Sequence, residues 1–137
     1  MQSSAHILVV EDDTLVAEVV IEVLEPTYRT THAATCAAAL ASFRKGGIDA
    51  ILLDCTLPDG VDPALLAEAD EAGVAVVVMS GHPELAERMA GAKRPFLLKP
   101  FLLDALLATV ERALPGQAAA AAAQSSRSRT HEQASQG

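Results

Sequence analysis

Six polar side chains that could do chemistry share one setting, because each stands at or directly after the end of an apolar run. They are Glu11, Asp12, Asp13, Asp54, Ser80 and Lys99. Clustered carboxylates repel one another and raise a pKa unless a cation lies among them, and carboxylate oxygens are ligands that Mg²⁺ takes. A lysine and a serine add a counter-charge and a donor for a tetrahedral anion. Together the six side chains suit phosphoryl transfer to Asp54, which would form an aspartyl phosphate.

Asp54 ends the apolar run that begins at Ala50, and the turn Leu57–Gly60 (Leu-Pro-Asp-Gly) follows it. This pattern predicts a buried strand with a carboxylate at its carboxyl end, where open α/β sheets bind ligands. Taken alone, the pattern also allows Asp54 to be only a strand cap. The choice depends on which charged residues the fold brings beside it.

Five stretches predict strands, at residues 6–10, 28–33, 50–54, 74–79 and 95–99. Stretches with helical spacing alternate with them, at residues 15–24, 37–43, 62–73, 83–89 and 102–114. The polar stretch 28–33 is typical of an edge strand. Strict alternation predicts an α/β fold, a doubly wound five-stranded parallel sheet with helices on both faces. Parallel strands end at one edge, so the six polar side chains should meet there.

Capping residues mark several of the predicted helices. Asp13, Thr35 and Asp62 stand where an N-cap is needed, and Pro63 occupies the first helical turn after Asp62. Gly73 marks the end of that helix. We interpret Asp13 as a cap rather than a ligand and Asp59 as a turn residue.

The chain of 137 residues fits one domain, which we place at residues 1–116. Residues 117–137 are rich in Ala, Ser, Arg and Gln and predict a disordered tail. A net charge of −8, 3% aromatic residues and no tryptophan argue against a nucleic-acid partner and suit a divalent cation.

No apolar run reaches the ~18 residues that a membrane span needs. The amino terminus lacks the pattern of a signal peptide, so we expect a cytoplasmic protein without a membrane partner. Cys36 and Cys55 lack metal-binding spacing, and we expect two buried thiols without a disulfide.

Glu11-Asp12, Asp54, Ser80 and Lys99-Pro100 stand in the order and strand-end positions of a known family. Over residues 6–114 the chain resembles the receiver domain of bacterial two-component response regulators. The turn after Asp54 and the sequence Lys-Pro-Phe after the fifth strand strengthen the resemblance. It implies a flavodoxin-like (βα)5 fold.

The resemblance implies that Asp54 accepts phosphate from a histidine kinase or a histidine phosphotransfer protein. Glu11 and Asp12 would hold Mg²⁺, or Mn²⁺, with Asp54 and the backbone carbonyl of Thr56. Lys99 would contact the phosphoryl group, with a cis peptide bond before Pro100.

The resemblance also implies a switch. Ser80 would move to hydrogen-bond the phosphate, and the inward rotation of Phe96 would accompany that movement. Thr56 and His82 would tune how long the phosphate survives. Two alternatives stay open: Phe96 as core filler and His82 as a solvated residue at a helix start.

Two features depart from the family pattern. Ser80 and Lys99 are nineteen residues apart, a shorter interval than the resemblance leads us to expect, which predicts a trimmed fourth helix. Only the tail follows the last predicted helix. We therefore expect a stand-alone receiver that signals by contact with a target protein and catalyses only its own phosphorylation and dephosphorylation.

Three other functions compete with this interpretation. Within the family, the chain could be a phosphorelay intermediate or a phosphate sink. An aspartate-nucleophile phosphatase of the haloacid dehalogenase type needs a second acid two residues after the nucleophile, where Thr56 stands. A flavin binder is disfavoured because Glu11, Asp12 and Asp13 would repel a phosphate after the first strand.

Overall fold

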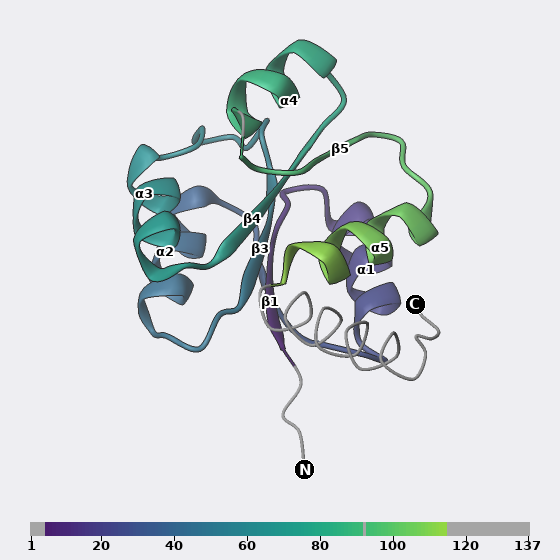
Figure 1. Cartoon of the computed structure of the whole chain (residues 1–137), viewed down its shortest axis with the longest axis horizontal. Helices are drawn as coiled ribbons and strands as arrows, with labels where there is room; N and C mark the ends of the chain where they lie inside the picture. Colours follow the sequence, from purple (N-terminus) through teal and green to yellow (C-terminus); the bar gives the residue numbers. More distant parts are fainter. Residues whose placement is uncertain (1–4, 92, 115–137) are drawn as a thin grey trace, which may run out of the picture.

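The computed structural model describes residues 5–91 and 93–114, in which five strands alternate with five helices (Figure 1). The strands are β1 (His6–Val10), β2 (Arg29–Ala33), β3 (Ala50–Asp54), β4 (Ala75–Ser80) and β5 (Phe96–Leu98). The helices are α1 (Thr14–Leu24), α2 (Cys36–Arg44), α3 (Pro63–Ala72), α4 (Pro83–Ala90) and α5 (Leu103–Ala113).

The strands form one parallel sheet in the order β2-β1-β3-β4-β5. This order confirms the predicted doubly wound, flavodoxin-like arrangement, and β2 is an edge strand as expected. In the register of the parallel strands, Asp54 of β3 pairs with Met79 of β4, and Ser80 of β4 pairs with Leu98 of β5. The carboxyl ends of β3, β4 and β5 therefore lie at the same edge.

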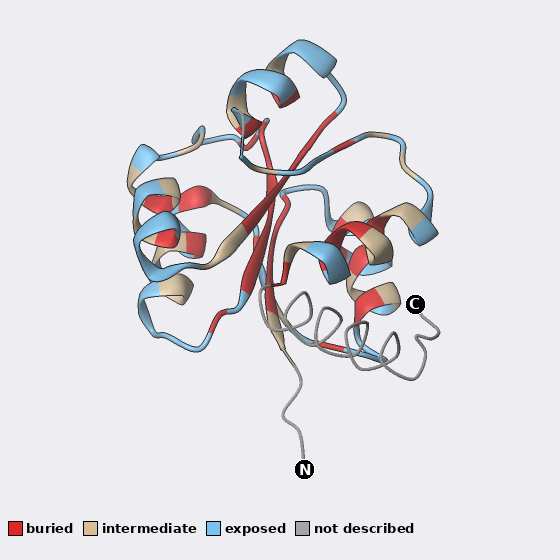
Figure 2. Ribbon diagram, viewed as in Figure 1, coloured by how far each residue is buried: buried red, intermediate tan, exposed pale blue. Residues whose placement is uncertain are grey.

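Helices cover both faces of the sheet, with α2 and α3 on one side and α1 and α5 on the other (Figure 1). The apolar run of β1 is continuous because its alternate residues face opposite sides of the sheet, and both sides are covered. Leu8 and Val10 pack in the core beneath α2 and α3, whereas Ile7 and Val9 pack beneath α1 and α5. Figure 2 shows the resulting buried residues along the strands and on the inner sides of these helices.

The predicted caps are confirmed. Asp13 Oδ1 accepts hydrogen bonds from the backbone N–H groups of Leu15 and Val16, at 3.0 and 3.3 Å. Thr35 Oγ1 accepts from Ala38 N at 3.1 Å, and Asp62 Oδ1 accepts from Ala64 N at 2.9 Å. Each side chain satisfies a backbone donor that the first helical turn leaves unpaired.

The predicted ends of β4 and β5 need correction. β4 spans residues 75–80 instead of 74–79, because Val74 N donates to Ala69 O at the end of α3. Ser80 lies inside the strand, since its carbonyl accepts from Lys99 N at 2.8 Å. β5 is the shorter segment Phe96–Leu98 rather than 95–99.

Helix α4 contacts β4 and β5 and has eight residues, fewer than the other four helices of the described ranges. It ends at Gly91, whose φ of 61° favours glycine. A short fourth helix is what the sequence predicted.

The structure also tests the predictions made for the cysteines, the peptide bond before Pro100 and membrane-spanning helices. Cys36 and Cys55 are buried free thiols, as predicted. The peptide bond between Lys99 and Pro100 is cis, also as predicted. Within residues 5–91 and 93–114, no helix combines the length and apolar character that crossing a bilayer requires. The predicted tail, residues 117–137, lies outside the described residues.

Leu65 of α3 is fully buried in the core and gives a direct test of this packing. We expect Leu65→Ala to lower the free energy of unfolding by about 2–5 kcal/mol, because it removes apolar contacts and leaves a cavity. Leu102, which is 77% exposed, is the matched control, and Leu102→Ala should change stability by less than about 0.5 kcal/mol. Urea unfolding followed by circular dichroism measures both, and equal losses would contradict the assigned core.

Candidate functional site

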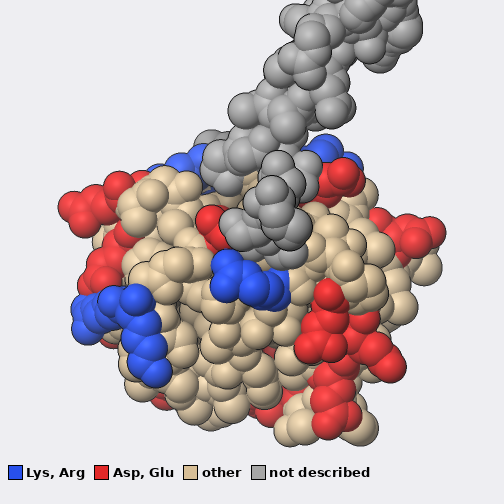
Figure 3. Space-filling view, turned by 90° about the horizontal axis from the view of Figure 1, so that it is seen from below, with Lys and Arg blue, Asp and Glu red and all other residues tan. Residues whose placement is uncertain are grey.

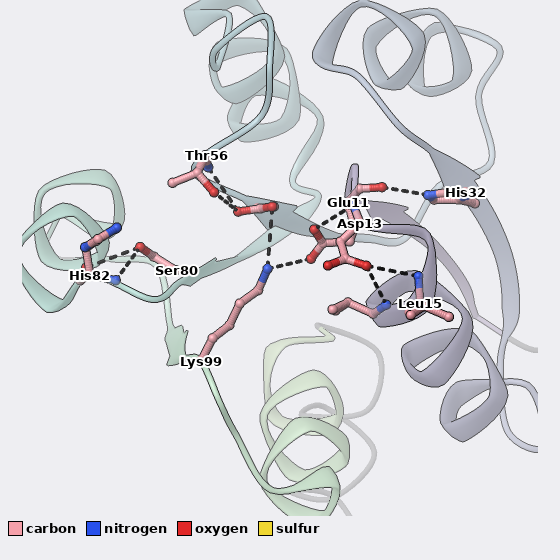
Figure 4. A network of polar contacts seen from close by, with 10 residues as sticks. Glu11, Asp13, Leu15, His32, Thr56, Ser80, His82 and Lys99 are labelled. Atoms are coloured by element: carbon pink, nitrogen blue, oxygen red, sulfur yellow. Dashed lines mark hydrogen bonds and ion pairs between the residues drawn. The ribbon is translucent and has the colours of Figure 1, made fainter.

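Three charged side chains from different strands meet at the carboxyl edge of the sheet (Figure 4). Asp54 ends β3, Glu11 follows β1, and Lys99 follows β5. Lys99 Nζ lies 2.7 Å from Glu11 Oε1 and 3.5 Å from Asp54 Oδ2. Both carboxylate residues are only 1% exposed, so the ammonium is their main protein counter-charge.

Thr56 holds the other oxygen of Asp54. The backbone N–H and the side-chain hydroxyl of Thr56 both donate to Asp54 Oδ1, at 3.0 and 2.9 Å. Asp54 Oδ2 faces Lys99. The carboxylate is thus fixed in orientation, with one oxygen bound by Thr56 and the other beside a cation.

The electrostatics of the site favour an ionised Asp54. Burial acts to raise the pKa of Asp54, but hydrogen bonds with Glu11 and Thr56 and the charge of Lys99 outweigh it and lower the pKa below its ordinary value. Burial and the neighbouring Asp54 raise the pKa of Glu11. Burial acts to lower the pKa of Lys99, but its two carboxylate partners outweigh this and raise it. At neutral pH the site therefore holds a carboxylate at Asp54 beside an ammonium.

The acidic residues also have the spacing of a cation site. Carboxylate oxygens of Glu11, Asp12 and Asp54 all lie within 4.8 Å of one another. Asp12 is exposed, whereas Glu11 and Asp54 are buried. Three oxygen donors at this spacing, one of them open to solvent, fit a hard divalent cation that keeps some of its waters. Asp13 instead caps α1, as predicted.

Ser80 lies at the same edge but points to the start of α4 (Figure 4). Its hydroxyl accepts from His82 N at 2.9 Å and donates to His82 O at 3.3 Å. A hydrogen bond from the Ser80 hydroxyl to a phosphate would replace its donation to His82 O, because the hydroxyl has a single proton. His82 is the N-cap residue of α4 and is exposed, without a side-chain capping bond.

Phe96, at the start of β5, is 39% exposed. This exposure excludes the alternative in which Phe96 only fills the core. Its backbone pairs with Val78 of β4, two residues before Ser80. The ring is therefore placed on the surface of the same two strands that carry Ser80 and Lys99.

Sequence reasoning missed three contacts around the site. Asp59, predicted as a turn residue, accepts from Cys36 N at 3.0 Å and Ala37 N at 3.1 Å, which caps α2 and lowers the pKa of the Asp59 carboxyl. His32 Nε2 lies 2.7 Å from the carbonyl oxygen of Glu11. The Thr56 hydroxyl bond to Asp54 is the third. Asp59 and His32 reach partners more than twenty residues away, so local patterns carry no signal for them.

An apolar groove of about 480 Å³ adjoins the site between α1 and the start of α5. Its lining includes Leu15 and Val19 of α1 and Lys99 itself. Leu15 is 73% exposed. Figure 3, which views the molecule from below the orientation of Figure 1, faces the opposite edge of the sheet, where both acidic and basic side chains are exposed. On α1, Glu18 and Glu22 are exposed and follow the groove residues Leu15 and Val19 by three positions, which places them on the same side of the helix. An apolar groove, with exposed acids beside it on α1, thus adjoins Lys99.

A family model and curated relatives both match most of this chain. A family model described as the response regulator receiver domain matches residues 7–111. The transcriptional regulatory protein PrrA of Mycobacterium tuberculosis is 33% identical over 118 residues, which cover 82% of this chain and 51% of PrrA. The nitrogen assimilation regulatory protein NtrX of Azorhizobium caulinodans is 33% identical over 119 residues, which cover 80% of this chain and 26% of NtrX. The chain thus spans about half of PrrA and about a quarter of NtrX.

The fold comparison agrees with the sequence comparison. The crystal structure of a CheY-like response regulator receiver domain protein from Methanospirillum hungatei matches with a TM-score of 0.72 and 28% identity. That match covers 84% of this chain and 97% of the other.

Replacing Lys99 tests how the buried carboxylates are balanced. Without the ammonium, the pKa values of Glu11 and Asp54 in the folded state should rise above those of the unfolded chain. The free energy of unfolding then falls as pH rises through these raised pKa values. The loss of stability caused by Lys99→Met should therefore be larger at pH 8 than at pH 5. We expect a loss of about 1–3 kcal/mol at pH 8, below the value for a fully buried pair because the Lys99 side chain is 25% exposed.

Urea unfolding at the two pH values measures this effect. Lys45→Met removes an exposed lysine at the end of α2 and serves as the control. An equal loss for Lys99→Met at both pH values would contradict the described charge balance.

Proposed function

The chain belongs to the response regulator receiver family of two-component systems, and from that premise we propose that Asp54 accepts a phosphoryl group from a histidine kinase or a histidine phosphotransfer protein. One observation carries the proposal. Asp54 is a buried carboxylate whose pKa is lowered and whose Oδ2 lies 3.5 Å from Lys99 Nζ. A carboxylate kept ionised beside a cation is suited to attack an anionic phosphoryl group.

The transfer step follows from the two different oxygens of Asp54. Oδ1 is held by both donors of Thr56, which orients the carboxylate. Oδ2 attacks phosphorus while the phosphorus–nitrogen bond of the donor phosphohistidine breaks and its electron pair stays on the imidazole. The product is an acyl phosphate on Asp54, and Lys99 offsets the negative charge of the phosphoryl oxygens.

The acidic cluster supports a role for Mg²⁺ or Mn²⁺ in this step. Glu11, Asp12 and Asp54, with the backbone carbonyl of Thr56, would hold the ion. When bound, the ion supplies positive charge between the carboxylates and the incoming phosphoryl group. Asp12 is the exposed member of the set, so it is placed to capture the ion from solvent.

The contacts of Ser80 support a switch. We expect the phosphoryl oxygens to draw the Ser80 hydroxyl away from the backbone of His82, which frees the start of α4. Phe96 lies on the neighbouring strand and would rotate inward as Ser80 moves. We propose that Thr56 and His82 set the lifetime of the phosphoryl group. Such a change alters the surface of α4 and β5, where a target protein would bind.

Two alternatives give different measurements. A phosphorelay intermediate or phosphate sink needs no change in target affinity, so comparing binding with and without a beryllofluoride mimic separates it from a switch. An aspartate-nucleophile phosphatase would turn over phosphate esters. That alternative is weakened by Thr56, whose hydroxyl binds Asp54 where a second acid would be required. We propose that the chain catalyses only its own phosphorylation and dephosphorylation.

The phosphodonor should dock over the apolar groove between α1 and α5. The groove includes Lys99 in its lining, so a partner seated there lies beside the acceptor. The exposed side chain of Leu15 offers apolar area, and Glu18 and Glu22 favour basic groups on the donor. This location explains an exposed leucine next to a charged site.

Asp54→Asn tests the acceptor directly. We expect no labelling of this variant by radioactive acetyl phosphate or by a phosphorylated kinase, because an amide is not a nucleophile. Chelation of Mg²⁺ with EDTA should also abolish labelling of the unmodified protein. Asp104→Asn, which makes the same change at an exposed residue of α5, is the control and should be labelled normally. Mg²⁺-dependent labelling of Asp54→Asn would refute the assignment.

Leu15→Ser tests the docking groove. First, a phosphotransfer profile against the histidine kinases of the host identifies the donor. We then expect transfer from that donor to slow by roughly ten- to hundredfold, because a buried leucine contributes roughly 1.5–3 kcal/mol to an interface. Labelling by acetyl phosphate should stay unchanged, since this small donor needs no groove. Leu98→Ser, at a 40% exposed leucine outside the groove, should affect neither reaction. Equal slowing with both donors would argue against docking here.

A further inference from the structure

A second cavity, of about 400 Å³, lies away from Asp54, where β4 begins and α5 ends. Its volume falls in the range of small-molecule sites. β4 runs from this cavity, which Val76 lines, to Ser80 at the opposite edge of the sheet (Figure 1). None of the residues that line it belongs to the phosphoacceptor site.

Positive charge predominates in this cavity. Lys93, Arg94 and Arg112 line it together with a single acid, Asp70. Asp70 Oδ2 accepts from Lys93 Nζ at 3.0 Å and from Arg94 Nη2 at 2.6 Å, so one oxygen serves two cations. Arg112 has no ion pair with any residue of the described ranges. This local excess of cations contrasts with the net charge of −8 of the whole chain.

Arg94 provides a second, independent observation. Its side chain is 13% exposed, and its Nε is buried without a hydrogen-bond partner in the part of the chain that the structure describes. A guanidinium offers a planar fork of donors that matches two oxygens, yet Asp70 meets it through one oxygen. A buried donor left unpaired costs about 1–3 kcal/mol. The guanidinium therefore has one carboxylate oxygen as its side-chain partner in the described ranges and one donor that this oxygen leaves unsatisfied.

The uncharged residues that line the cavity indicate what the ligand carries besides its anionic group. Val74, Val76, Pro95 and Ala113 form apolar walls. Thr109, which is 7% exposed, adds a hydroxyl-bearing side chain. A free inorganic ion would leave these walls uncovered, whereas a molecule with an apolar body would bury them.

We propose that this cavity binds a small organic anion, in which a carboxylate or phosphate group bound by Arg94 and Arg112 is carried on an apolar body. Both head groups present two oxygens to the guanidinium fork. The site is separate from Asp54, so the proposal does not depend on phosphoryl transfer.

An NMR titration of the full ¹⁵N-labelled chain tests the proposal. The probes are benzoate and phenyl phosphate, with benzyl alcohol as the neutral control, in chloride buffer without divalent cations. We expect saturable amide shifts at residues 74–76, 93–94 and 109–113 with at least one of the two anions. The stronger anion identifies the head group. Asp54→Asn should bind equally well, which separates this site from the phosphoacceptor.

Two charge variants sharpen the test. Arg112→Gln should weaken binding about tenfold, because it removes a charged donor from the cavity. Lys45→Gln removes the same charge from an exposed position at the end of α2 and should leave binding unchanged. Equal weakening in both variants would show only general charge attraction and overturn the proposal. Equal binding of benzyl alcohol, shifts confined to residues around Asp54, or no saturation up to roughly 20 mM probe would also overturn it.

Discussion

The pairing of Lys99 with Glu11 and Asp54 is the interaction on which the functional edge of the sheet depends. Two carboxylates that are 1% exposed lie close enough to act on each other, and each would be costly to ionise alone. The lysine that offsets them comes from 88 residues beyond Glu11. The parallel sheet, in which β1, β3 and β5 end at one edge, delivers these three groups to one point. The site is therefore a consequence of the topology rather than of any local segment.

The fold divides into a rigid frame and a less constrained part. β1 and β3 are buried on both faces, which fixes Glu11 and Asp54 at their ends. By contrast, β5 has three residues, and α4 has eight and lacks a side-chain cap bond. Ser80 lies between the two parts, with its backbone in the sheet and its hydroxyl bonded to the first residue of the α4 turn. A new charge on Asp54 would thus act on the Glu11 carboxylate, which the buried strands fix, and on the Ser80 hydroxyl, which is bonded to the backbone of His82.

The parts of this arrangement that the sequence could predict are those set by local rules and by strand topology. Apolar periodicity located the strands and helices, and Asp13 and Asp62 could be identified as caps because their partners are two or three residues away. The meeting of Asp54 with Lys99 followed from the common edge of parallel strands. The cap that Asp59 provides for α2 could not be predicted, because it depends on how two distant loops pack. The exact end of β4 depended in the same way on the bond between Lys99 and Ser80.

Charged residues at several helix ends follow the direction of the helix dipole. In a parallel α/β fold every helix begins near the carboxyl ends of the strands and finishes near the amino ends. Helix dipoles favour acids at the first edge and bases at the second. Asp13 and Asp62 at helix starts and Arg44 and Arg112 in last turns follow this rule.

Helix stability thus accounts for Arg112 whether or not a ligand binds beside it. It does not account for Lys93 and Arg94, which lie in the connection between α4 and β5. Nor does it explain why the buried Arg94 directs only one of its nitrogens to Asp70. Two of the three cations that line this cavity are therefore loop residues that serve no helix, and an anion is the partner that would balance them.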